Sequence, residues 1–229
     1  MKTVGIVLAG GSGRRMGTET EKQYLTLAGY PVLYYSLRAM EESFLDEILV
    51  VAAESRIGYC REEIVERYHF TKVKQIVAGG AERSDSVANA LRAIGEADYV
   101  FIHDGARPCL TAEILNRGLE RVKETGACVA GVPSKDTVKI VEKDGRISFT
   151  PERGKVWNIQ TPQVFAFPVI REAFALLAEH PEEKVTDDAM VVEKMLGRPV
   201  YVYEGDYRNL KITTPEDLGS AEVFLKEMR

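Results

Sequence analysis

The residues best suited to chemistry lie together in one glycine-rich segment near the start of the chain. Residues 8–25 read LAGGSGRRMGTETEKQYL, so Arg14, Arg15 and Lys22 accompany four glycines. Glycines let a backbone approach a ligand closely, and successive exposed amides form a concave site for anions. Three cations beside such a site favour a polyanion, and the segment therefore predicts a phosphate-binding loop.

An apolar run at Val4–Leu8 leads into this loop and is typical of a buried strand. Strands and helices of about 10–15 residues then alternate, and the early strands are apolar on both faces. This alternation predicts an α/β fold with a Rossmann-like, doubly wound and mostly parallel sheet. Further strands are expected at 47–53, 73–78, 99–102, 128–132 and 200–203, and helices from Pro31, at 55–68, from about Ser84, at 112–124, 168–179 and 187–196, and from Pro215.

A different pattern occupies residues 134–155. The stretch TVKIVEKDGRISFT reads as two short strands around Lys143, Asp144 and Gly145, which indicates a β-hairpin. Such a hairpin often projects from an α/β domain, either as a surface flap or as an arm that packs on a second subunit. Residues 1–229 are otherwise expected to form one domain.

Composition limits the kinds of partner. The formal net charge is -5, whereas nucleic-acid-binding surfaces usually carry a basic excess, so no nucleic acid is expected. No apolar run approaches the roughly 18 residues of a membrane span. Cys60, Cys109 and Cys128 form no CxxC pair, and no hydrophobic targeting segment follows Met1. These features predict a cytoplasmic protein without membrane contact.

Two common phosphate-loop motifs fail here. The pattern GxxxxGK[ST] has no match, because neither Gly10 nor Gly11 is followed at the right distance by Gly-Lys. The dinucleotide pattern GxGxxG would need glycine at 11, 13 and 16, but residue 16 is Met16. A strand–loop–helix unit suited to nucleotides therefore carries another fingerprint, and an NAD-dependent dehydrogenase is a poor interpretation.

The loop instead resembles the signature of the pyrophosphorylase-type nucleotidyltransferases, and its ending KQYL is similar to the polyol-phosphate cytidylyltransferases. The similarity runs from Val4 to about Leu218 and implies the nucleotidyltransferase type of sheet. It points to the branch that joins CTP to methylerythritol 4-phosphate. The other matching motifs, in chain order, are GGAERSDSV (79–87), HDGARP (103–108), KDTVK (135–139), WNIQTPQVF (157–165), TDDA (186–189) and NLKITTPEDL (209–218).

The resemblance implies that a phosphate oxygen of the polyol phosphate attacks the α-phosphorus of CTP and that pyrophosphate leaves. This oxygen is already ionised near neutral pH, since the second pKa of a phosphate monoester is about 6. No general base is then needed, and the site must hold two polyanions in line. Arg15 and Lys22 match the family's catalytic cations, and Asp104 matches the carboxylate that meets Mg²⁺ or another divalent cation.

The remaining family positions fall into two groups. The nucleotide-binding positions are Leu8, Ala9, Gly10, Gly11, Ser12, Gly13, Gly79, Gly80, Arg83, Ser86, Asp104 and Gly105. The positions that bind the polyol phosphate are Asp104, Arg107, Thr137, Arg153, Thr186, Asp187 and Lys211. In the family, the residue at the Arg153 position reaches into a neighbouring subunit, which implies a homodimer formed through the 134–155 arm. His103 beside Asp104 is expected to be a packed histidine, and Cys109 a small packing residue.

Two positions depart from the family pattern: Gly10 stands where alanine is common, and Ala81 where aspartate is usual. Neither change matters if main-chain groups read the base. If a side chain helps, CTP binding is altered, and Glu82-Arg83 either compensates or forms an exposed ion pair.

Two other functions remain open at this point. A ribitol 5-phosphate cytidylyltransferase shares several motifs, but its loop usually reads Asp-Ser-Val-Arg-Pro where this chain has Asp-Gly-Ala-Arg-Pro at 104–108. A non-catalytic nucleotide-binding regulator would be expected to lose a cation or the acidic residue, yet Arg15, Lys22, Asp104 and Lys211 are all present.

We predict that Arg15→Ala and Lys22→Ala each abolish detectable pyrophosphate release while the protein remains folded. Removing one such charge from a transition state commonly costs about 2.7–4 kcal/mol of barrier. The checks are a pyrophosphate-release assay and a thermal unfolding curve. Rates like those of the wild type in both variants would refute the catalytic assignment.

Overall fold

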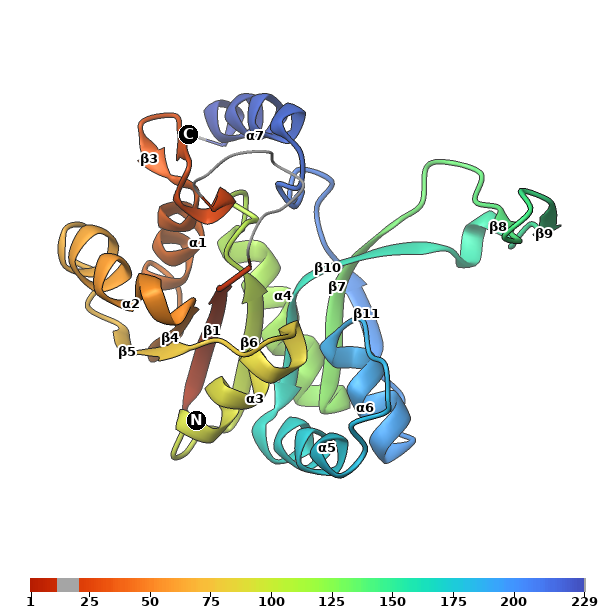
Figure 1. Cartoon of the computed structure of the whole chain (residues 1–229), viewed down its shortest axis with the longest axis horizontal. Coiled ribbons are helices and arrows are strands. Elements are labelled where there is room, and N and C mark those ends of the chain that lie inside the picture. The colour runs from red at the N-terminus through yellow and green to blue at the C-terminus, as the bar shows by residue number, and fades with distance from the viewer. Residues whose placement is uncertain (12–20, 229) are drawn as a thin grey trace.

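The computed structural model describes residues 1–11 and 21–228. Seven strands form one sheet in the order β11-β7-β10-β6-β1-β4-β5 (Figure 1). Strands β5, β4, β1 and β6 pair in parallel, as do β7 and β11, whereas β10 runs antiparallel to both β6 and β7. The predicted mostly parallel α/β sheet is confirmed. The strands are β1 (Thr3–Ala9), β4 (Glu47–Ala52), β5 (Val73–Ala78), β6 (Tyr99–Asp104), β7 (Ala127–Pro133), β10 (Trp157–Ala166) and β11 (Tyr201–Glu204).

The central strands are apolar throughout because helices cover both faces of the sheet. Successive side chains of a strand point to opposite faces. In β1 and β4, Val7 and Val50 accordingly join one buried cluster, whereas Ile6 and Leu49 join the other. Helices α1 (Val32–Glu41) and α4 (Ala112–Thr125) pack on the first face. Helices α3 (Arg83–Ala93), α5 (Phe167–Glu179) and α6 (Asp188–Leu196) pack on the second.

The helix expected at 55–68 has a mixed hydrogen-bond pattern. It begins as a 3-10 turn (η3, Glu54–Arg56), continues as a short α-helix (α2, Ile57–Tyr59) and ends as a π-helix (η4, Cys60–Glu66). Cys60 and Ile64 are its buried residues. Apolar spacing predicts which side faces the core but does not distinguish these hydrogen-bond patterns.

Helix α7 (Pro215–Glu227) closes the fold beyond one end of the sheet (Figure 1). Thr214 and Asp217 form a reciprocal capping box at its start, which satisfies backbone N–H groups that a helix leaves unpaired. Its buried Ala221 and Leu225 join a third cluster with Ile212. The short strand β2 (Thr26–Leu27), which pairs with β3 (Tyr30–Pro31), contacts this helix. The helix thereby anchors the segment around Ile212.

The predicted hairpin is present and projects from the body of the protein (Figure 1). Strands β8 (Ile140–Val141) and β9 (Ile147–Phe149) pair antiparallel. Gly145 in the turn has φ of 87°, a left-handed conformation that glycine adopts without steric cost. The packing partner of the arm stays a prediction.

All three cysteines are free and buried. Burial raises the pKa of the Cys109 thiol to about 12, so this residue is a packing residue, as expected, and not a nucleophile. Among the described residues, no helix is both long and apolar enough to cross a membrane.

Candidate active site

A cleft of about 410 Å³ opens where the first parallel strands end. Leu8 of β1 lies beside Asp104 of β6 in the sheet register. The chain runs from β1 outward to β4 and β5 on one side and then returns to β6 on the other. Ligands of open α/β sheets bind at such a switch point. The predicted site residues that line the cleft are Leu8, Gly10, Gly11, Lys22, Gly80, Arg83, Ser86, Asp104 and Lys211.

Asp104 is a nearly buried carboxylate surrounded by three cations. Lys211 Nζ lies 2.9 Å from Oδ2, and Arg107 Nε lies 3.6 Å from the same oxygen. Arg83 Nε lies 3.6 Å from Oδ1. Burial alone would raise the pKa of the Asp104 carboxyl, but the charges of these three cations outweigh it and hold the pKa well below its usual range. The carboxylate is therefore ionised at neutral pH.

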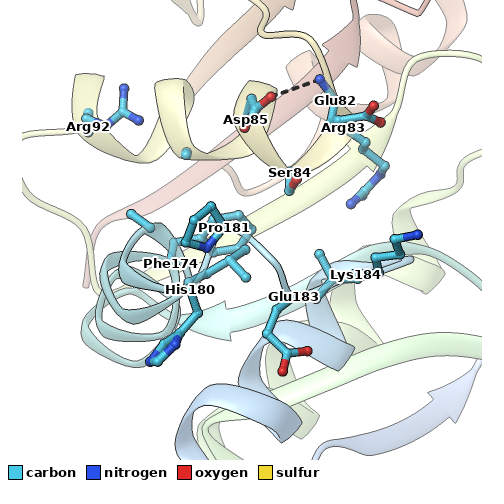
Figure 2. Close-up of a pocket in the computed structure, with 14 residues that line it drawn as sticks. Glu82, Arg83, Ser84, Asp85, Arg92, Phe174, His180, Pro181, Glu183 and Lys184 are labelled. Atoms are coloured by element: carbon cyan, nitrogen blue, oxygen red, sulfur yellow. Dashed lines mark hydrogen bonds between the residues drawn. The ribbon is translucent and has the colours of Figure 1, made fainter.

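Arg83 is held mainly by a carboxylate that the sequence analysis did not assign. Its Nη1 and Nη2 each donate to one oxygen of Asp188 at 2.7 Å, which is a bidentate ion pair. The alternative of an exposed Glu82-Arg83 ion pair was wrong. The Glu82 side chain instead caps α3, and its backbone N–H donates to Asp85 (Figure 2).

A second and larger hollow, of about 800 Å³, lies between α3 on one side and α5 with the segment that follows it on the other (Figure 2). Phe174, Pro181 and Lys184 are among its lining residues, and Glu82 and Arg83 line both hollows. Arg83 is therefore part of the wall between the cleft at Asp104 and this second hollow.

Hydrogen bonds fix the backbone that carries Asp104. The Asp104 N–H donates to Thr161 Oγ1 at 3.0 Å, so this hydroxyl can donate its own proton to His103 Nδ1, also at 3.0 Å. His103 Nε2 then donates to the Arg107 carbonyl at 3.3 Å. Burial lowers the pKa of His103 to about 4, which agrees with this neutral tautomer. The expectation of a packed histidine is confirmed.

The chain around Lys211 is tied to the same loop. Arg107 Nη1 donates to the Asn209 carbonyl at 2.7 Å, and the Ile212 N–H donates to the Ala106 carbonyl at 2.9 Å. Lys22 Nζ donates to the Ile212 carbonyl at 2.7 Å. Lys22 is only 9% exposed, so its charge acts in a poorly solvated setting. These bonds bring residues far apart in the sequence to one side of the cleft.

The glycine segments are shaped by neighbouring side chains. Gln23 Nε2 donates to the Gly11 carbonyl at 3.0 Å, and the Gly80 N–H donates to Ser86 Oγ at 3.1 Å. A Cβ added to Gly80 would overlap Asp85, whereas one added to Gly10 would meet the Ala52 backbone at an ordinary 3.5 Å. Alanine at position 10, common in the family, would therefore fit here.

Three other predicted nucleotide positions help to join the strand ends and do not line the cleft. Ala9 is buried at the end of β1. The Gly79 N–H donates to the Ala52 carbonyl at 2.8 Å, and the Gly105 N–H donates to the Leu8 carbonyl at 2.9 Å. The predicted residues Ser12, Gly13 and Arg15, together with Arg14, lie outside the described residues.

The predicted polyol-phosphate residues lie in three places. Asp104, Arg107 and Lys211 form the ion cluster at the cleft, Thr186 and Asp187 lie at the start of α6 and do not line the cleft, and Thr137 and Arg153 lie on the arm. Asp187 caps α6 through Oδ1, which accepts from the Met190 N–H, and its Oδ2 accepts from Gln163 Nε2 at 2.8 Å. Thr186 precedes it and is exposed. Thr137 and Arg153 lie on the exposed arm and do not line this cleft. A role for these two residues in another subunit stays a prediction.

Four polar residues that support the site were missed in the sequence: Gln23, Gln163, Thr161 and Asp188. All four occur inside motifs that carried the family resemblance. For Thr161 and Gln163, the sequence signal was their position among the apolar residues of WNIQTPQVF. Polar side chains buried in such a stretch need hydrogen-bond partners, which indicates a supporting role. Their partners come from distant parts of the chain, and spacing alone does not predict them.

Comparisons with known proteins cover nearly the whole chain. A family model described as 2-C-methyl-D-erythritol 4-phosphate cytidylyltransferase matches residues 3–227. Proteins of that name from Lachnoclostridium phytofermentans and Geobacter metallireducens are each 49% identical; each match covers 99% of this chain, and 97% and 99% of the relatives. A solved 4-diphosphocytidyl-2C-methyl-D-erythritol synthase from Anaerococcus prevotii has a TM-score of 0.85 at 32% identity, covering 98% of this chain and 96% of its own. These findings do not favour the ribitol phosphate alternative.

We predict that His103 makes the protein less stable in mild acid. In the unfolded protein the His103 side chain has a pKa of about 6.5, whereas burial in the folded protein lowers this pKa to about 4. Between these two values the unfolded state binds a proton that the folded state does not bind. The free energy of unfolding should therefore fall by about 3 kcal/mol as the pH drops through this window. Urea denaturation at pH 7 and pH 4.5 checks this against His103→Gln, which lacks the titration. Equal pH slopes in both proteins would contradict it.

Proposed function

The chain belongs to the family of 2-C-methyl-D-erythritol 4-phosphate cytidylyltransferases, and on this premise we propose that the cleft at the ends of β1 and β6 is its active site. The enzyme transfers the CMP moiety of CTP to methylerythritol 4-phosphate, a step of non-mevalonate isoprenoid synthesis. One observation carries the placement: Lys22, Arg83 and Lys211 converge with the ionised Asp104 in one cleft beside two glycine segments.

The reaction needs placement of charge and not a general base. An ionised phosphate oxygen of the acceptor forms a bond to the α-phosphorus of CTP. The bond from that phosphorus to the bridging oxygen breaks, and pyrophosphate leaves with the electron pair. The proton count does not change at the reacting phosphorus. His103 is therefore not required as a base, and its burial and low pKa agree with that.

We propose that Lys22 and Arg15 stabilise the negative charge that develops in the transition state. Lys22 Nζ is oriented by the Ile212 carbonyl, so the ammonium group is in place before the nucleotide arrives. The role of Arg15 rests on the family resemblance. Lys211 is positioned to meet the acceptor phosphate, since it faces the same cleft and bonds Asp104.

We further propose that Asp104 is the protein's ligand for Mg²⁺ or another divalent cation. Within the described part of the chain, its Oδ1 is ion-paired only with Arg83 Nε, at a distance of 3.6 Å that is too long for a hydrogen bond. Among the described residues, no three His, Cys, Asp or Glu side chains form a metal cluster. Mg²⁺ commonly takes one carboxylate with substrate phosphates and water, so the donor set fits. The ion would supply charge neutralisation to the phosphates.

We propose a homodimer formed through the 134–155 arm. Exposed apolar side chains lie on the hairpin: Ile140 at 42%, Val141 at 53%, Ile147 at 55% and Phe149 at 56%. An exposed apolar surface of this kind supports an interaction site, and the family resemblance supports a second copy as the partner. Arg153 at the base of the arm would then enter the partner's cleft.

The three free cysteines support a reducing, cytoplasmic location.

We predict that Val141→Glu and Phe149→Glu convert the dimer to a monomer and lower kcat at least tenfold. The charge would be buried in the interface, and the arm would no longer deliver Arg153. Val223→Glu is the matched control, since Val223 is also 53% exposed but lies on α7. Sedimentation velocity and pyrophosphate release are the measurements. A dimer that survives both arm substitutions would refute this interface.

The acceptor and nucleotide assignments are tested together by pyrophosphate release with four nucleoside triphosphates and two polyol phosphates. We expect turnover with CTP and methylerythritol 4-phosphate to exceed every other pair by at least tenfold. A preference for ribitol 5-phosphate would contradict the acceptor assignment. A preference for UTP would show that the loop with Ala81 no longer selects cytosine.

A further inference from the structure

Arg83 lies between two carboxylates and pairs closely with one of them. Its two terminal nitrogens bond Asp188 at 2.7 Å each, whereas only Nε faces Asp104, at 3.6 Å. The fork of a guanidinium matches a carboxylate best when two N–H groups donate in parallel. Asp188 has that arrangement, and Asp104 does not.

Arg83 borders open space and is not fully enclosed by its neighbours. The residue lines the catalytic cleft and also the larger hollow beyond α3 (Figure 2). Its side chain remains 29% exposed. With open space on two sides, an arginine side chain released from Asp188 has room to turn its fork toward the nearest remaining carboxylate, which is Asp104.

Asp188, in contrast, is firmly placed. Its side chain is 1% exposed, and the residue begins α6. Its backbone N–H and that of Ala189 both donate to Gln163 Oε1 at 3.0 Å. Gln163 belongs to β10 in the middle of the sheet, so the position of Asp188 is set by the core and not by the ligands of the cleft.

We propose that Asp188 is a positioning residue that holds the fork of Arg83 away from Asp104 and so keeps Asp104 Oδ1 available to a divalent cation. The inference rests on the proposed role of Asp104 as the metal ligand. Asp188 touches neither nucleotide nor metal and acts through Arg83. Without its charge, the guanidinium and the metal ion compete for the same carboxylate.

The test is calorimetric binding of CTP to the full-length protein without acceptor, with and without Mg²⁺. The dissociation constant without Mg²⁺ divided by that with Mg²⁺ gives the contribution of the metal to CTP binding, and this quotient is the ratio used below. We expect Asp188→Asn, which is nearly isosteric, to lower this ratio about tenfold. A merely structural defect would weaken both binding reactions and leave the ratio unchanged, and that result would overturn the proposal.

The double variant Arg83→Gln/Asp188→Asn tests whether the Arg83 guanidinium is the group that competes with the metal ion. It removes the competing guanidinium and leaves no unpaired buried charge, so it is also the variant more certain to fold. We expect the ratio to return to at least the wild-type value. A ratio as low as that expected for Asp188→Asn alone would overturn the proposal, because no guanidinium is left to compete.

A matched control breaks another bidentate pair outside the cleft. Asp206 accepts from Arg208 Nη2 at 2.6 Å and from its Nε at 3.1 Å. Asp206→Asn should leave the Mg²⁺ ratio at the wild-type value, and an equal fall there would overturn the specific role of Asp188. If the wild-type protein shows a ratio of one, the metal site at Asp104 is refuted together with this inference.

Discussion

The rest of the site depends on one buried carboxylate kept ionised by surrounding cations. Burial of Asp104 opposes its charge, and the ammonium of Lys211 with the guanidinium groups of Arg83 and Arg107 more than compensates. Each of these cations comes from a different part of the chain. Because a buried charge left unpaired is costly, the ion cluster favours the closed arrangement of these segments. The same arrangement forms one wall of the cleft at the ends of β1 and β6.

The supporting contacts explain how a sheet of ordinary α/β topology acquires this cleft. Thr161 and Gln163 lie on β10, the antiparallel strand between β6 and β7. One fixes the backbone of Asp104, and the other fixes the start of α6, where Asp188 holds Arg83. A single strand therefore orients both carboxylates that share the arginine. The cleft is organised by the sheet before any ligand binds, which is what transition-state stabilisation requires.

Much of the sheet could be predicted because strands covered on both faces read as continuous apolar runs, as at Val4–Leu8 and 47–53. Strand β10 was harder, since Gln160, Thr161 and Gln163 interrupt that pattern and are buried only through distant partners. Within the site, Lys22, Asp104 and Lys211 could be identified from motifs, and the cleft contains all three. Asp188 could not be assigned, because its role depends on where Arg83 lies after folding.

We place the nucleotide in the cleft around Asp104, although the hollow beyond Arg83 is larger. The most direct measurement is a crystal structure of the protein with CTP and Mg²⁺. We expect the triphosphate between the Gly10–Gly11 segment and Lys22, with the metal ion on Asp104. A nucleotide bound instead between α3 and residues 180–185, with Asp104 still paired only to its cations, would contradict this placement.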